Sequence, residues 1–173
     1  MADETFCGIV LSGDEDQRCG LAFLSDRVET FSETDDDRIL ELIEERRPAV
    51  IAFTAPLNEP GIEGFREDEE ELVDEGYRFL PPDLRDRDEM ERTQFMMNAI
   101  KRLGFMPEVI ECRPKITADI LDIEGDDDLE EFGVETGAIH NMTEFEAVLA
   151  AITAKFYEND QFRDKGVIVP EEV

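Results

Sequence analysis

The stretch Cys7-Gly8-Ile9-Val10-Leu11-Ser12-Gly13 decides how the rest of this chain is interpreted. It carries no charge, and it ends on a small polar residue followed by a glycine. A short apolar run bounded by a turn signal is typical of a strand that is buried on both faces of a sheet. We therefore expect this stretch to form the central strand, with any catalytic site at its carboxyl end.

Two further strand-like runs follow at short distance. Arg18 to Leu24 is largely apolar, Ser25-Asp26 is a turn pair, and Arg27 to Phe31 alternates apolar and polar residues. Short links between consecutive strands favour antiparallel pairing, so the first three strands are expected to form a meander.

Helices and strands alternate through the remainder. Thr34 is a suitable N-cap for a helix that Pro48 ends, and Asn141 is a suitable N-cap for the last helix, with Glu144 at the capping-box position. The other expected elements are strands at Ala49–Thr54, Pro107–Cys112 and Gly166–Pro170 (the last at an edge), and helices at Asp88–Leu103 and Lys115–Ile123.

This order predicts an α/β fold. An antiparallel three-strand meander is joined by two parallel strands into a five-stranded mixed sheet, with helices on both faces. The two added strands run parallel to the first, which places Ser12, Thr54 and Cys112 near a common edge. Residues 1–173 are expected to form a single domain with an irregular insertion at about 55–88, in which Phe65 to Glu75 can form a short acidic helix.

The charge balance is extreme, with 46 acidic against 17 basic residues and a net charge of −29. An acidic surface could mimic nucleic acid or attract a basic partner. Alternatively, it could be an adaptation to a cytoplasm at molar salt, where self-repulsion is screened. The even spread of acids favours the second interpretation. Nucleic-acid binding in such a medium would rest on short-range contacts, because counterion release is weak there.

Other features narrow the class of protein. No apolar run is long enough to span a membrane, and the acidic N-terminus lacks a signal pattern, so a cytoplasmic location is expected. Cys7, Cys19 and Cys112 have no metal-site spacing and lie in apolar runs, which predicts buried free thiols.

With its local sequences, this order of elements resembles the RNase H-like fold. More narrowly, it resembles a family of predicted nucleases of unknown function, as a diverged member of salt-adapted archaeal type. The family patterns G-I-D-x-S/A-G, apolar-D-x-P-L/I, E-x-x-P and D-A-x-x-A-A-x-T-A are similar to segments 8–13, 53–57, 111–114 and 146–154. The pattern R-x-x-D/E matches Arg66 and Glu69.

The resemblance implies acidic side chains that cluster around Mg²⁺ or Mn²⁺ ions. Val10 and Thr54 stand where the family pattern has carboxylates, whereas Glu111 and Glu146 keep theirs. Two carboxylates hold a two-metal centre poorly. The expectation is therefore a diverged domain without efficient nuclease activity, in a binding or scaffolding role. The alternative is an active metal-dependent phosphodiesterase that acts on nucleic acid through Glu111, Glu146 and Asp14.

Each candidate carboxylate has a second interpretation. Glu111 lies inside an apolar strand, where a charge needs a partner, and Arg113 is on the same face two residues later, so the pair could be a structural ion pair. Glu146 flanks the apolar stripe of its helix and could be a ligand or a solvated residue. Asp14 could replace a lost ligand or belong to a solvated turn.

The resemblance also suggests substrate contacts. Ser12, Thr54 and Arg113 lie at strand ends, and Arg66 could bind phosphate or form a surface salt bridge. His140, the only histidine, precedes the last helix and is a weak candidate for a proton carrier.

The charge pattern generates a prediction about salt. Lowering the salt concentration from molar to about 0.1 M lengthens the Debye length from about 3 Å to about 10 Å and strengthens repulsion among the acids. The melting temperature is expected to fall across this range when followed by circular dichroism. A melting temperature that stays constant or rises at low salt would contradict the salt-adapted interpretation.

Overall fold

The structure, a computed structural model, describes residues 4–12, 18–55, 87–164 and 167–171. Asp14, Arg66 and the expected acidic helix at Phe65–Glu75 lie outside these residues, as does most of the expected insertion. Within the described ranges, no helix combines the length and the apolar character needed to cross a bilayer.

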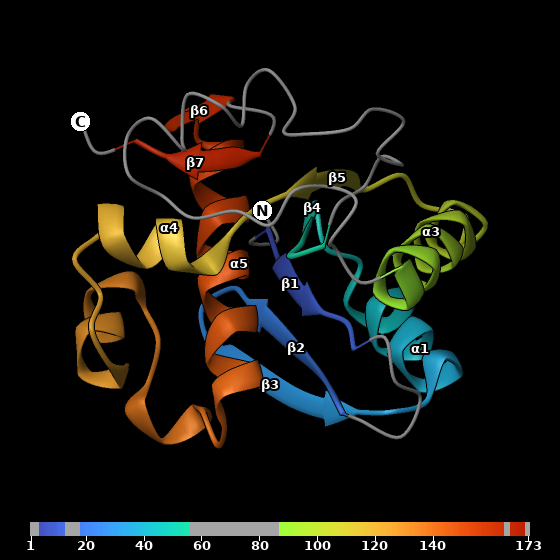
Figure 1. Cartoon of the computed structure of the whole chain (residues 1–173), viewed down its shortest axis with the longest axis horizontal. Helices are drawn as coiled ribbons and strands as arrows, with labels where there is room; N and C mark the ends of the chain where they lie inside the picture. Colours follow the sequence, from blue (N-terminus) through green and yellow to red (C-terminus); the bar gives the residue numbers. More distant parts are fainter. Residues whose placement is uncertain (1–3, 13–17, 56–86, 165–166, 172–173) are drawn as a thin grey trace.

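A five-stranded sheet forms the centre of the molecule, with the strand order β3-β2-β1-β4-β5 (Figure 1). β1 pairs antiparallel with β2 and parallel with β4, β2 pairs antiparallel with β3, and β4 pairs parallel with β5. The central place of the first strand and the mixed topology are thereby confirmed. The strands are β1 (Phe6–Val10), β2 (Cys19–Leu24), β3 (Val28–Glu33), β4 (Val50–Phe53) and β5 (Glu108–Glu111).

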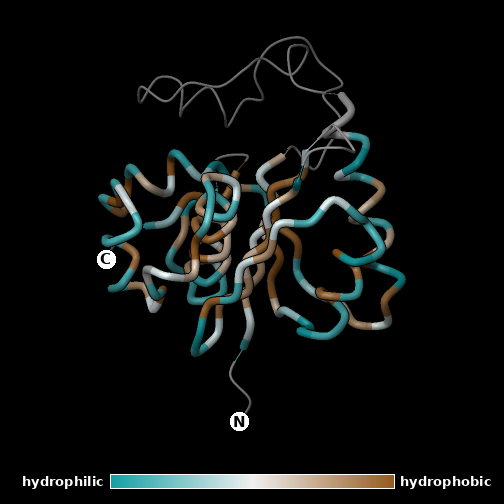
Figure 2. Tube along the Cα trace, turned by 90° about the horizontal axis from the view of Figure 1, so that it is seen from below, coloured by the Kyte–Doolittle hydropathy of each residue, from teal (hydrophilic) through white to brown (hydrophobic). Residues whose placement is uncertain are grey.

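Helices cover both faces of the sheet, as expected. α1 (Asp36–Arg46) and α3 (Arg87–Lys101) lie on one face, and α5 (Met142–Glu158) crosses the other (Figure 1). α4 (Pro114–Ile120) and the 3₁₀ segments η2 (Asp126–Phe132) and η3 (Thr136–Ala138) lie on the α5 side. Figure 2 shows the hydrophobic segments gathered between these layers.

Alternate residues along the strands pack into two separate hydrophobic cores, one on each face of the sheet. Cys7 and Ile9 of β1 pack with Ile39 and Met96 on the α1 and α3 side, whereas Phe6 packs on the α5 side. This alternation follows from the pleat of a strand, and it explains why the central strand has no charged residue on either face.

The side of α5 that faces the sheet lies unusually close to two glycines. A Cβ atom at Gly8 would stand 1.9 Å from the carbonyl oxygen of Ala147, and one at Gly20 would stand 2.5 Å from that of Thr143. These distances are far below van der Waals contact, so only glycine fits at either position. Buried alanines of the helix, among them Ala150 and Ala151, allow the same approach from the other side.

The helix ends show one error in the sequence-based expectations. Asp35, not Thr34, is the N-cap of α1, and its side chain accepts a hydrogen bond from the Asp37 N–H. A carboxylate is favoured there because the helix N-terminus is positive. The N-cap at Asn141 is confirmed, since its side chain accepts from the Glu144 N–H at 2.8 Å.

The end of the chain also differs from expectation. The expected edge strand at Gly166–Pro170 corresponds to β7 (Ile168–Pro170), which pairs antiparallel with β6 (Phe162–Asp164) in a separate two-stranded sheet. One parallel bridge from Ile168 to Cys112 links this ribbon to the end of β5. β6 was missed because three residues of mixed polarity give no periodic signal.

The packing of α5 generates a prediction. Gly8→Ala places a methyl group against the Ala147 backbone, which cannot move without displacing the helix, so the free energy of unfolding is expected to fall by about 3 kcal/mol. Chemical denaturation followed by circular dichroism measures it. Gly137→Ala is the matched control, because a Cβ at Gly137 meets no atom within 4 Å. Equal stability of the two variants would show that α5 packs differently.

Candidate functional site at the carboxyl ends of the parallel strands

The carboxyl ends of β1, β4 and β5 meet at one edge of the sheet. The Thr54 N–H donates to the Ile9 carbonyl at 3.2 Å, and the Cys112 N–H donates to the Phe53 carbonyl at 2.9 Å. Continuing this register places Val10, Thr54 and Cys112 side by side. The juxtaposition expected for Thr54 and Cys112 is thus present in the structure.

The register also divides the candidate residues between the two faces of the sheet. Ile9 pairs with Phe53, and Phe53 pairs with Glu111, so Glu111 lies on the face whose core contains Ile9 and Phe53. Val10 packs on the opposite, α5-covered face, and strand alternation places Thr54 there as well.

Glu146 belongs to the α5 side. It lies between Thr143, which faces Gly20, and Ala147, which faces Gly8, so it is level with the carboxyl end of β1. Of the positions matched to family carboxylates, those of Val10, Thr54 and Glu146 therefore share a face, and that of Glu111 does not.

Glu111 is engaged by a guanidinium group. Its Oε2 atom lies 3.0 Å from Nη2 of Arg113, and the Glu111 side chain is only 5% exposed. Arg113 Nη1 also donates to the carbonyls of Thr54 at 2.9 Å and Cys112 at 3.1 Å. Of the two alternatives for Glu111, the structural ion pair is the one that the structure contains.

Glu146 has an altered acidity. Its partial burial raises the pKa of its carboxyl group, and the nearby Lys115 ammonium opposes this effect. A half-buried carboxyl group beside a cation at the end of a central strand is a feature that functional sites share with structural ion pairs.

Arg92 of α3 is a partly buried arginine that was not predicted from the sequence. It donates to the carbonyls of Ser12 at 2.8 Å and Thr34 at 3.0 Å, and its Nη2 lies 2.7 Å from an Asp36 carboxylate oxygen. It thereby joins the segment after β1 to the start of α1. Ser12 enters this joint through its backbone, and a substrate contact by its side chain stays a prediction.

Glu144 is a second buried charge that was not expected. Its carboxylate accepts hydrogen bonds from the Ser32 hydroxyl, the Asn141 side-chain amide, the His140 backbone N–H and the His140 ring Nδ1. These bonds outweigh the effect of burial, so the pKa of Glu144 is lowered. The sequence correctly placed Glu144 at the capping-box position. Its carboxylate, however, accepts from the backbone N–H of His140, the residue before the N-cap, and its bond to Ser32 connects α5 to β3.

His140 is held through this carboxylate. Its ring is 69% exposed, and its Nδ1 lies 2.9 Å from Glu144 Oε1. The same Glu144 carboxylate also accepts a hydrogen bond from the Ser32 hydroxyl of the edge strand β3. The structure thus gives His140 a place beside the N-terminus of α5, and a role as proton carrier stays a prediction.

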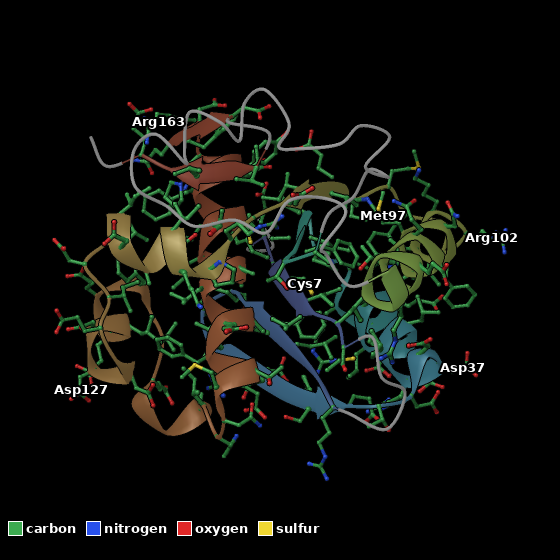
Figure 3. The ribbon with its side chains drawn as sticks, in the orientation of Figure 1. Cys7, Asp37, Met97, Arg102, Asp127 and Arg163 are labelled. Atoms are coloured by element: carbon green, nitrogen blue, oxygen red, sulfur yellow. The ribbon has the colours of Figure 1, made fainter. Side chains whose placement is uncertain are left out.

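The cysteines are free and buried, as expected. Burial raises the pKa of the Cys7 thiol and raises that of Cys112 to about 12. Thiols of this kind are poor nucleophiles and poor metal ligands at neutral pH. Figure 3 shows Cys7 inside the molecule, while Asp37, Arg102 and Asp127 point outward.

A pocket of about 260 Å³ lies away from the strand ends. Its walls come from the turn after β2, from η2 and from the C-terminal half of α5, and they include Leu24, Phe132, Ile152 and Lys155. Because Thr143 and Glu146 lie at the other end of α5, this pocket does not belong to the site predicted from the sequence.

The described residues do not fit a two-metal carboxylate centre. Among them, no three His, Cys, Asp or Glu side chains gather closely enough to hold a metal ion. Valine offers no ligand atom, and the threonine hydroxyl is neutral. The Glu111 carboxylate faces the other side of the sheet and is bound by Arg113. This donor set lacks the negative charge that two divalent ions require.

Comparison with solved structures establishes the fold class. Thermus thermophilus RuvC in complex with a Holliday junction substrate superimposes with a TM-score of 0.54 and 14% identity, covering 96% of this chain and 99% of that one. A second Thermus thermophilus RuvC structure gives a TM-score of 0.52 with the same identity and coverage. The chain therefore has the RNase H-like fold. No protein-family model and no curated protein matches its sequence.

The buried Glu144 carboxylate generates a prediction about pH. Its folded-state pKa lies below the ordinary value of 4.5, so its stabilisation is fully present above pH 4.5 and is lost as the pH falls through the lower folded value. Glu144→Gln is expected to lower the free energy of unfolding by about 2 kcal/mol at pH 7, and the difference from the native protein should shrink in acid.

Chemical denaturation at a series of pH values measures this difference. The matched control is Glu41→Gln, which removes an exposed carboxylate paired with Arg38 and should change the free energy of unfolding by less than about 1 kcal/mol. A Glu144→Gln effect that is independent of pH would contradict the assigned role of the charge.

Proposed function

We propose that this protein is a diverged member of the predicted nuclease family, with a binding or scaffolding role and without efficient metal-dependent hydrolysis. The observation that carries the proposal is the set of side chains at the carboxyl ends of β1, β4 and β5. Val10 and Thr54 occupy the face beneath α5 where the family pattern has carboxylates, and Glu111 is bound to Arg113 on the other face.

The physical reason is charge. Two divalent ions about 4 Å apart are held together by anionic oxygens that offset their mutual repulsion. In this chain, a single matched carboxylate, Glu146, shares the relevant face, and burial favours its neutral form. The guanidinium of Arg113 adds positive charge at the same edge of the sheet.

Nucleic acid is the partner class to be tested first. The support is the fold shared with RuvC, one structure of which contains a Holliday junction substrate. The net charge of −29 opposes long-range attraction to phosphates, so the proposed contacts are short-range and operate in the molar salt of a salt-adapted cytoplasm.

The second candidate function is an active phosphodiesterase that uses Glu111, Glu146 and Asp14 with Mg²⁺ or Mn²⁺. It is favoured by the half-buried Glu146 carboxyl group, whose raised pKa is a common property of catalytic acids. This candidate requires an arrangement of Glu111 other than its observed pairing with Arg113.

Binding and cleavage assays in molar KCl separate the two functions. Fluorescent junction, duplex and single-stranded DNA and RNA are offered to the protein with Mg²⁺, with Mn²⁺ or with a chelator. The proposed function predicts binding that the chelator does not abolish, without cleavage. Metal-dependent cleavage that disappears in Glu146→Gln would establish the second candidate instead.

The lost carboxylates generate a prediction that concerns only the α5 face. Val10→Asp with Thr54→Asp adds two acids to the side that carries Glu146. This change should lower the free energy of unfolding by about 2 kcal/mol without metal, because like charges crowd a partly buried place. Manganese should restore the stability by binding the folded state.

Calorimetric titration and thermal melts with and without Mn²⁺ measure this effect in molar salt. Val10→Asn with Thr54→Asn is the control of equal size without charge. A folded acidic variant that binds Mn²⁺ no better than this control would count against the assignment of these positions.

A further inference from the structure

Oxygen atoms of Glu111, Thr54 and Cys112 lie within hydrogen-bonding distance of the Arg113 guanidinium group. Glu111 Oε2 is 3.0 Å from Nη2, and the carbonyl oxygens of Thr54 and Cys112 are 2.9 Å and 3.1 Å from Nη1. One carboxylate and two peptide carbonyls, contributed by the ends of β4 and β5, thus point at a single cation.

The backbone fixes the position of this cation. Arg113 directly follows the parallel bridge residue Cys112 and is the extended N-cap residue of α4, whose first residue is Pro114. The proline ring restricts the preceding residue to extended conformations, so the side chain leaves the main chain in a defined direction. The Arg113 side chain is 17% exposed, so the charge lies at the edge of the core.

Carboxylate and carbonyl oxygens are also the ligands that hard divalent cations prefer. We infer that Arg113 is a resident cation: its guanidinium occupies an oxygen-lined cation site at the ends of β4 and β5 and excludes a divalent metal ion from it. The inference rests on the proposed function, and it supplies a reason why this edge of the sheet works without metal.

Electrostatics explains why the guanidinium, and not a divalent ion, occupies the place beside Glu111. The Glu111 carboxylate is 5% exposed and needs a compensating charge, which a guanidinium supplies from within the chain. A divalent ion can bind only if this group is displaced, because otherwise the ion would meet a positive charge at contact distance. Removal of the guanidinium leaves the same three oxygens for an ion and water.

The test is a titration of Arg113→Ala with Mn²⁺ in molar KCl. Electron paramagnetic resonance counts the bound ions, and thermal melts report their effect on stability. Without metal, the melting temperature is expected to fall by roughly 10 °C, since the buried Glu111 carboxylate loses the guanidinium that is paired with it. The variant should bind one Mn²⁺ at least about tenfold more tightly than the native protein, and saturation should recover roughly 5 °C.

Three further variants separate a cation site from nonspecific attraction to an acidic protein. Arg38→Ala removes the same charge from the exposed pair with Glu41 and should gain no Mn²⁺ binding. Arg113→Lys keeps a cation in place and should also gain none. Glu111→Gln combined with Arg113→Ala should lose the gain, because the charged ligand is missing.

The inference is overturned if folded Arg113→Ala binds Mn²⁺ no better than Arg38→Ala, or if the double variant keeps the full gain. If Arg113→Ala does not fold without metal, Arg113→Gln is titrated under the same criteria. Tight Mn²⁺ binding and cleavage by the native protein would overturn the proposed function, and that result is distinct from either failure in the Arg113 series.

Discussion

The contact between the α5 backbone and the central strand is the constraint on which the rest of the structure depends. Because Gly8 and Gly20 have no side chain, the helix approaches the sheet until its peptide groups touch the strands. This approach fixes the height of α5 along β1, and with it the place of Glu146 relative to Val10. The bond between Glu144 and Ser32 joins the N-terminal end of the helix to the edge strand β3, and the bonds between Glu144 and His140 join it to the segment before the helix.

Arg46, Arg92 and Arg113 each connect separate elements of this acidic chain through ion pairs, hydrogen bonds or ring contacts. Arg46 lies 5.1 Å and 4.9 Å from the ring centroids of Phe23 and Phe31, and it pairs with Glu29 across the face of the edge strand. Its hydrogen bonds lower the pKa of Glu29. Arg92 and Arg113 each donate hydrogen bonds to carbonyl and carboxylate oxygens near the carboxyl ends of the parallel strands. Each of these three arginines thus joins different elements of the fold through carboxylate or carbonyl oxygens.

This distribution bears directly on function. An RNase H-like sheet brings the ends of its parallel strands together whatever side chains they carry, so the fold alone does not specify hydrolysis. In this protein, that edge presents Val10 and Thr54 on one face and a compensated Glu111 on the other. At the matched strand positions, Val10 and Thr54 supply no carboxylate, and the Glu111 carboxylate is paired with Arg113.

The sequence by itself determined the five strands of the central sheet, the helices packed on it and their order, because these depend on local patterns, whereas the short strand β6 escaped. The uncharged first strand predicted its central place, and Asn141 predicted the start of α5. Tertiary structure alone decided which face each strand-end residue occupies, since this follows from the register of Phe53 with Glu111. It also decided the partners of Arg92, whose contact with Ser12 spans 80 residues. Such contacts leave no periodic signal in the sequence, because they arise only when packed elements bring distant side chains within hydrogen-bonding distance.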